Sequence, residues 1–128
     1  MIDRIQWSTG AAVGSAASAT ATGYSAHIAG EILAVHVAYL DSPPAATTDF
    51  TLSDEGDPAS ESIITLVDGA TNQKIYPRRV TEKNEGTDIL YVTGEEVHEP
   101  YVVHGRLKAT IAQTDADDSV TVTVWYRQ

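Results

Sequence analysis

The chain has 128 residues, of which 42% are hydrophobic, and this length suits one domain of ordinary size. It contains no cysteine, which excludes disulfides, thiolate metal sites and cysteine nucleophiles. Eighteen acidic residues against eight basic ones give a net charge of −10, and no basic stripe is present, so nucleic acid is not an expected partner. No apolar stretch is long enough for a membrane span, and the first 30 residues lack the apolar core of a signal peptide. We therefore expect a soluble protein, made in the cytoplasm, without a membrane partner.

Hydrophobic residues recur mainly with a period of two, which is typical of strands. Residues 2–7 form the first candidate strand. Residues 10–25 are mostly small, and the Ala/Thr alternation of 15–22 predicts a strand that pairs with residues 31–40 through a turn near 26–30. The alternative is that residues 10–25 form an extended arm on a neighbouring subunit.

Residues 31–40 are almost continuously apolar and rich in branched side chains, which predicts a central strand with both faces partly covered. Gly30 before this run and Pro43 and Pro44 after it limit it to the length of a strand. Four short candidates follow, separated by turn-forming Gly, Asn, Asp and Pro residues. They are residues 49–52, 62–67, 74–77 and 88–92.

The C-terminal quarter of the chain has the clearest alternation, and we predict a β-hairpin over residues 102–127. Its first strand, 103–112, and its second, 119–127, flank the acidic loop 115–118. One face of the hairpin is expected to be apolar, formed by Val103, Leu107, Ala109, Ile111, Val120, Val122, Val124 and Tyr126.

These segments amount to about eight or nine short strands at a spacing of roughly ten residues, without a convincing helix, repeat or linker. We therefore predict an all-β fold, an antiparallel β-sandwich of jelly-roll type, as a single domain over residues 1–128.

No motif of a metal site or an enzyme is found. The four histidines, at 27, 36, 98 and 104, lack zinc-motif spacing, and no Gly-x-Ser-x-Gly elbow or Gly-rich phosphate loop is present. The acidic loops 54–57 and 115–118 offer oxygen ligands of the kind calcium takes, but neither fits the EF-hand pattern. We expect no enzyme activity and no cofactor; calcium in these loops is the alternative, and its test is the effect of calcium and EDTA on the melting temperature.

The candidates for contact with a partner are aromatic and cationic residues. Trp125 points away from the apolar face of its strand, so it is either covered by further structure or an anchor at an interface. Arg78 and Arg79 follow a candidate strand and are suited to pair with acidic groups of a partner or of another copy of this acidic chain. The full set of candidate partner-binding residues is Trp7, Tyr76, Arg78, Arg79, Trp125 and Arg127.

The order of segments over most of residues 20–127 resembles a family of small structural proteins of tailed-phage virions. The matching pieces are residues 30–39, 45–52, 63–66, 75–78, 103–113 and 120–124. The resemblance implies a β-sandwich protein of the phage head, a capsid decoration or cement protein on the outer capsid surface of the virion. It also implies the major capsid protein as a partner and self-association, with a trimer as one form. The alternatives are a neck, tail or fibre-base protein of the virion and a sugar-binding β-sandwich with an exposed row of aromatic rings.

Overall fold

A computed structural model describes residues 1–41, 43–69, 71–82, 84–88, 90 and 97–128. All regular structure in these ranges is β-strand, which confirms the predicted all-β class. No helix in the described part is long and apolar enough to cross a membrane. The strands are β1 (Ile2–Ser8), β2 (Ala19–Tyr24), β3 (Ile28–Tyr39), β4 (Asp49–Asp54), β5 (Ser62–Leu66), β6 (Gln73–Ile75), β7 (Arg79–Val80), β8 (His98–Glu99), β9 (Val102–Gly105), β10 (Leu107–Thr114) and β11 (Val120–Arg127).

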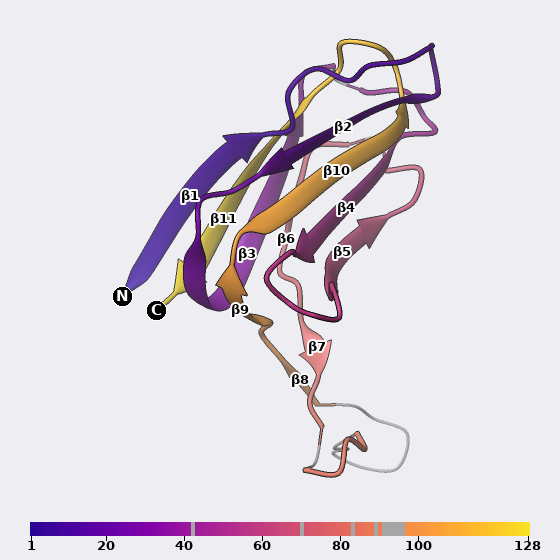
Figure 1. Ribbon diagram of the computed structural model, residues 1–128. Coiled ribbons are helices and arrows are strands. Elements are labelled where there is room, and N and C mark those ends of the chain that lie inside the picture. Colours follow the sequence, from indigo (N-terminus) through magenta and orange to yellow (C-terminus); the bar gives the residue numbers. More distant parts are fainter. Residues whose placement is uncertain (42, 70, 83, 89, 91–96) are drawn as a thin grey trace.

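The strands form two antiparallel sheets and one small ribbon (Figure 1). The five-stranded sheet has the order β1-β11-β3, and both β6 and β9 pair with the other edge of β3. The four-stranded sheet has the order β2-β10-β4-β5, and β7 pairs with β8 in the ribbon. The sandwich predicted from alternation is therefore observed.

The core lies between the two sheets and follows from the period-two pattern, because alternate side chains of every long strand point inward. Phe50, Leu52, Leu107 and Ile111 of the four-stranded sheet are fully buried. They belong to the same apolar cluster as the inward side chains of the five-stranded sheet, which are Ile32, Val35, Val37, Val120, Val122 and Val124.

The predicted hairpin over 102–127 is wrong in its pairing. Strand β10 pairs with β2 and β4, whereas β11 pairs with β1 and β3, so the 115–118 loop crosses from one sheet to the other. The predicted strand 103–112 is also divided, because the chain changes sheets at Gly105, which has a φ of +146°. Alternation specifies which face of a strand is buried, but it does not specify which strand pairs with it.

The small-residue segment forms a strand, but with a different partner from the one predicted. Strand β2 pairs with β10 and not with β3. Ala19 and Ala21 are buried in the core, which fits the strand and not an arm lying on a neighbour. The division at Gly105 adds one strand to those predicted, and the ribbon adds two more, β7 and β8. Of the candidate strand 88–92, residues 89, 91 and 92 lie outside the described residues, and Asp88 forms an isolated bridge with Glu82.

Candidate partner-binding face

The outer face of the five-stranded sheet gathers cationic and aromatic side chains. Strand β1 contributes through its alternation: Ile5 and Trp7 pack against the core, so Arg4, which precedes Ile5, projects outward. The same rule places Trp125 of β11 outward, because Val124 and Tyr126 on either side are buried. We call this surface the cationic face and define it by Arg4, His36, Lys74, Tyr76, Trp125 and Arg127.

The register of the sheet brings these residues together from distant parts of the sequence. Arg4 lies opposite Trp125, which in turn lies opposite Ala34 of β3. In the next row, Thr123 lies opposite His36, and His36 opposite Lys74. Cross-strand neighbours of this kind have Cβ atoms about 5 Å apart, so their side chains make contact.

Lys74 connects the two aromatic residues of the face. Its ammonium lies 4.4 Å from the centre of the Trp125 ring and 5.5 Å from that of Tyr76. Cation–π contacts of this geometry stabilise by roughly 0.5–1 kcal/mol at exposed positions. Ala34 is only 4% exposed although its register partner Trp125 points outward, so this cluster shields the outer surface of β3.

The face carries positive charge in a protein that is acidic as a whole. Arg4, Lys74 and Arg127 belong to it, and the Glu31 carboxylate beside them is paired with Arg127. Both partners of this pair are exposed to a large degree, so the pair contributes little to stability and can exchange for another carboxylate. The local excess of cations contrasts with the net charge of −10 and favours an acidic partner surface.

The predicted contact residues divide into two groups. Tyr76, Trp125 and Arg127 lie on the cationic face, together with Arg4, His36 and Lys74, which sequence reasoning did not select as contacts. The alternation of residues 2–7 could have indicated Arg4, but Lys74 reaches Trp125 only because β3 lies between their strands.

The other three predicted contacts have neighbours within the chain. The Trp7 ring packs on the core, and its indole N–H donates to the Gly23 carbonyl at 3.3 Å. Arg79 lies in the ribbon and pairs with Glu99 at 2.8 Å and Glu82 at 3.3 Å. Arg78 donates to its neighbour's carbonyl and to the Leu33 carbonyl at 3.1 Å, where the ladder between β3 and β11 shifts register.

The acidic loops use their carboxylates to cap the backbone. Asp54 accepts from the Gly56 N–H at 3.0 Å, and Asp57 from those of Ala59 and Glu61 at 3.2 and 3.1 Å. The buried carboxylate of Asp118 likewise accepts from two backbone N–H groups. In the described part of the chain, no group of three or more His, Asp or Glu side chains is arranged to hold a metal ion.

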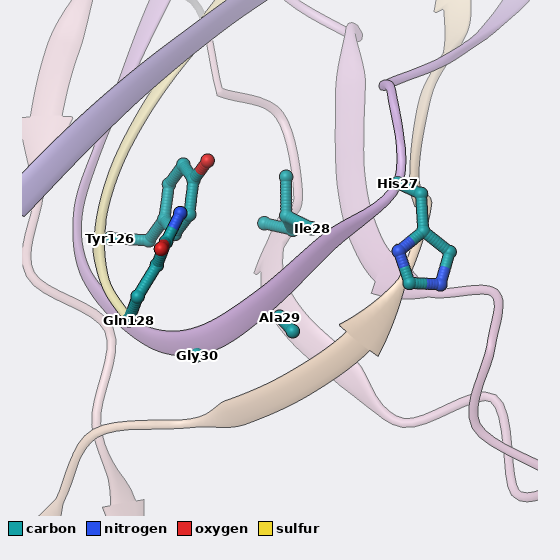
Figure 2. A pocket seen from close by; sticks show the side chains of 6 residues that line it. All are labelled: His27, Ile28, Ala29, Gly30, Tyr126 and Gln128. Atoms are coloured by element: carbon teal, nitrogen blue, oxygen red, sulfur yellow. The ribbon is translucent and has the colours of Figure 1, made fainter.

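Two histidines that are distant in sequence meet near the start of β3. The rings of His27 and His104 lie edge to face, with centroids 4.9 Å apart. His27 also lines an open pocket of about 500 Å³ beside Ile28, Ala29 and Gly30. Figure 2 shows its imidazole at one end, away from Tyr126 and Gln128 at the other, so the polar groups do not converge on a common point.

Exposed aromatic rings of the described residues carry cationic neighbours rather than forming a bare platform. Lys74 lies against Trp125 and Tyr76, and the Arg106 guanidinium lies 4.0 Å from the centre of the Tyr24 ring on the other sheet. Sugar-binding surfaces use open ring faces for stacking. This arrangement therefore does not favour the sugar-binding alternative.

No protein-family model and no curated protein matches the chain. Among solved structures, it is similar to a mutant VP2 protein of infectious bursal disease virus in derived T=1 particles, with 14% identity and a TM-score of 0.38, covering 98% of this chain and 36% of that one. It is also similar to the structure of the Gx strain of this virus, with 15% identity and a TM-score of 0.35, covering 99% and 37%. The chain thus spans little more than a third of the length of these viral chains. TM-scores at this level carry no conclusion about its function.

Proposed function

We propose that the protein is a structural component of a tailed-phage particle, a decoration protein of the outer head surface that works by binding other proteins. Its place in a phage head rests on the resemblance over residues 20–127. The observation that supports a binding role is the cationic face, where aromatic rings and cations gather on one side of an acidic sandwich. Trp, Tyr and Arg are the residues that contribute most to the free energy of protein interfaces.

In this proposal the chain performs no chemical step. The sandwich presents Trp125 and Tyr76 at fixed positions, and Arg4, Lys74 and Arg127 attract carboxylates of the partner surface. One such contact alone would bind with modest affinity. On a symmetric shell, with the major capsid protein as the underlying partner, many equivalent contacts act together, and multivalency raises the overall affinity.

The first experiment is quantitative mass spectrometry of purified particles of the phage that encodes the chain. A copy number close to that of the major capsid protein supports a decoration protein of the head. A few copies per particle point to the neck, tail or fibre base instead, and absence from the particle contradicts the proposal.

The second experiment tests the face itself. Particles prepared without the protein are mixed with the purified wild type, with Trp125→Ala and with Trp7→Phe as the matched aromatic control. We expect Trp125→Ala to lower binding to the particle about thirtyfold or more, because truncation of a Trp anchor typically costs about 2 kcal/mol or more. Trp7→Phe keeps the core ring and should bind like the wild type. Equal binding of all three would exclude the cationic face as the contact.

A further inference from the structure

We propose that His27 and His104 form a binding site for a divalent transition-metal ion of the zinc and nickel kind, beside the point where the chain changes sheets at Gly105. The two imidazoles supply two ligands, and water fills the remaining positions. Imidazole is a preferred ligand of these ions, whereas calcium and magnesium prefer oxygen. The inference goes beyond the proposed function and does not depend on it.

The register of β3 with β9 places both side chains on one side of the sheet. Ala29 lies directly opposite His104, and His27 is two residues before Ala29, so its side chain points to the same side. His27 and His104 are thus diagonal neighbours, which lie about 7–8 Å apart along the backbone and meet through long side chains. Both are exposed, because the neighbouring Ile28 and Val103 take the buried positions. The pair is formed by strand register, which is why it lacks the spacing of a zinc motif.

The separation of the two rings fits two ligands of one ion. The centroids of the His27 and His104 rings are 4.9 Å apart, and the ring planes stand at 88°. Two imidazoles bound to one ion at about 2.1 Å, with a nitrogen–metal–nitrogen angle of about 90–110°, have centroids roughly 4.5–5.2 Å apart. The angle between the planes is not restricted, because each imidazole can rotate about its metal–nitrogen bond. The backbone therefore already holds the rings at the separation that chelation requires.

Space for an ion and its water lies beside both rings. Ala29, opposite His104, has only a methyl group as its side chain. Together with Ala29, His27 lines the open pocket of about 500 Å³, and its imidazole stands at one end of it (Figure 2). His104 lines a second hollow of about 390 Å³, whose other side chains include three carboxylates. These carboxylates, which attract a cation to this corner, are Asp54, Asp57 and Glu61.

Hydrogen bonds hold the backbone on both sides of the pair. The Ser25 N–H donates to the Leu107 carbonyl at 2.9 Å, and the Ser25 hydroxyl accepts from the Leu107 N–H at 2.8 Å. Ile28 is paired with Gly105. Ligands on an ordered backbone lose less conformational freedom on binding than flexible ligands do. An ion held by both rings would join two segments that are distant in sequence, and such a link stabilises the folded state.

The site differs from a closed structural zinc site, which has four protein ligands. No group of three or more His, Asp or Glu side chains is arranged around an ion position in the described ranges. An ion on His27 and His104 therefore keeps open positions that water occupies. We infer an exchangeable site, which fills when the ion is supplied.

The test measures binding of Ni²⁺ and Zn²⁺ to the full chain, which is first treated with EDTA and dialysed. Isothermal titration calorimetry compares the wild type with His27→Gln and with His104→Gln. The matched control is His98→Gln, at an exposed histidine of the β7–β8 ribbon. A second measurement needs only the wild type, because paramagnetic Ni²⁺ broadens the NMR signals of the rings that bind it. Circular dichroism melts establish that each variant folds.

We expect the wild type to bind one ion per chain. Loss of either ring should lower the association constant about tenfold or more, because the second metal–ligand bond no longer forms within the same complex. The His98→Gln control should bind like the wild type. Ni²⁺ should broaden the ring signals of His27 and His104 at concentrations that leave those of the other two histidines sharp. Zn²⁺ should raise the melting temperature of the wild type and not that of the variant with both substitutions.

Each other result overturns the inference. Single variants that bind as tightly as the wild type would place the ion on other groups, such as the nearby carboxylates. Equal broadening of all four histidine rings would show unspecific binding. A wild type that binds neither ion would show that His27 and His104 make an edge-to-face contact and nothing more. The binding of Trp125→Ala to particles is measured separately, so the proposed function can stand or fail independently of these results.

Discussion

The hydroxyl of Thr114 donates a hydrogen bond of 3.0 Å to the buried carboxylate of Asp118. Thr114 also accepts from the hydroxyl of Thr48 at 3.0 Å, and the other oxygen of Asp118 accepts from the backbone N–H groups of Asp41 and Ser119 at 3.1 and 2.8 Å. This network lies where the chain passes from β10 to β11. It fixes the crossing between the two sheets and gives every buried polar group in it a partner.

Asp118→Ala should lower the free energy of unfolding by about 3 kcal/mol or more, because two backbone N–H groups and the Thr114 hydroxyl lose a buried acceptor. Urea unfolding followed by tryptophan fluorescence measures the change. The matched control is Asp117→Asn, at an exposed position on the same loop, where Asn tolerates the positive φ of 68°. It should stay within about 0.5 kcal/mol of the wild type. A small effect of Asp118→Ala would mean that the network does not hold the crossing.

The same crossing shows how far the sequence could predict the fold. The alternation of residues 119–127 correctly indicated that Val120, Val122 and Val124 are buried. It could not indicate that β10 and β11 belong to different sheets, because an acidic loop of this length joins a hairpin as readily as it joins two sheets. The decisive interactions join Asp118 to Thr114 and to the backbone of Asp41, and Thr114 in turn to Thr48. Residues 41 and 48 are far from this crossing in sequence.

Only part of the candidate site could be predicted from the sequence, for a similar reason. Alternation within one strand is enough to place Trp125 outward, and this prediction agrees with the structure. Lys74 became part of the site only through the register of β3 with both β6 and β11, which is a property of three strands. Trp7 was selected for its residue type, but its strand alternation turns it toward the core.

Gly23 should be intolerant of any side chain because it lies where the edges of the two sheets meet. A Cβ at this position would be 2.3 Å from the carbonyl oxygen of Ser8 in β1. Gly23→Ala should therefore destabilise by about 2–3 kcal/mol, through displacement of β1 from β2. Gly10→Ala is the control, since Gly10 has a φ of +76° but open space around it, and it should cost only about 1 kcal/mol. Thermal unfolding compares the two, and equal costs would contradict the close approach of the sheets.

Ionisation of the buried Tyr39 phenol should lower the stability of the fold at alkaline pH. Burial and the nearby carboxylate of Asp118 raise the pKa of Tyr39 to about 12, above the value of about 10 for an unfolded chain. The neutral phenol is favoured in the folded state, so its contribution is fully present below about pH 10 and is lost as the pH rises toward about 12. A shift of this size corresponds to about 2–3 kcal/mol at most.

Tyr39→Phe should remove this loss. The buried hydroxyl of Tyr39 has no hydrogen-bond partner among the described residues, so its removal should leave stability unchanged or raise it by about 1 kcal/mol near neutral pH. Urea unfolding at about pH 8 and about pH 11 should show a smaller decline for the variant than for the wild type. Parallel declines would mean that other groups cause the alkaline loss.

Calcium should leave the melting temperature unchanged, and so should EDTA. The carboxylates of Asp54, Asp57 and Asp118 accept backbone N–H groups, and a bound ion would have to replace these bonds. Differential scanning calorimetry measures the effect, with magnesium as the control for ionic strength. A rise with calcium alone would show that one of the loops rearranges to bind it.

The charge of the cationic face can be measured through Trp125 itself. In the Trp7→Phe background Trp125 is the remaining tryptophan, and its ring lies 4.4 Å from the ammonium of Lys74. An anionic quencher is attracted by a positive surface and a cationic quencher is repelled, so iodide should quench this fluorescence more strongly than caesium does. Lys74→Gln should lower the ratio of the two quenching constants, whereas Lys108→Gln on the other sheet should leave it unchanged. Because both quenchers reach the same ring, a change in its exposure affects them alike and the ratio reports charge. A ratio that Lys74→Gln does not alter would show that Lys74 does not set the potential at Trp125, and would contradict an acidic partner surface at this ring.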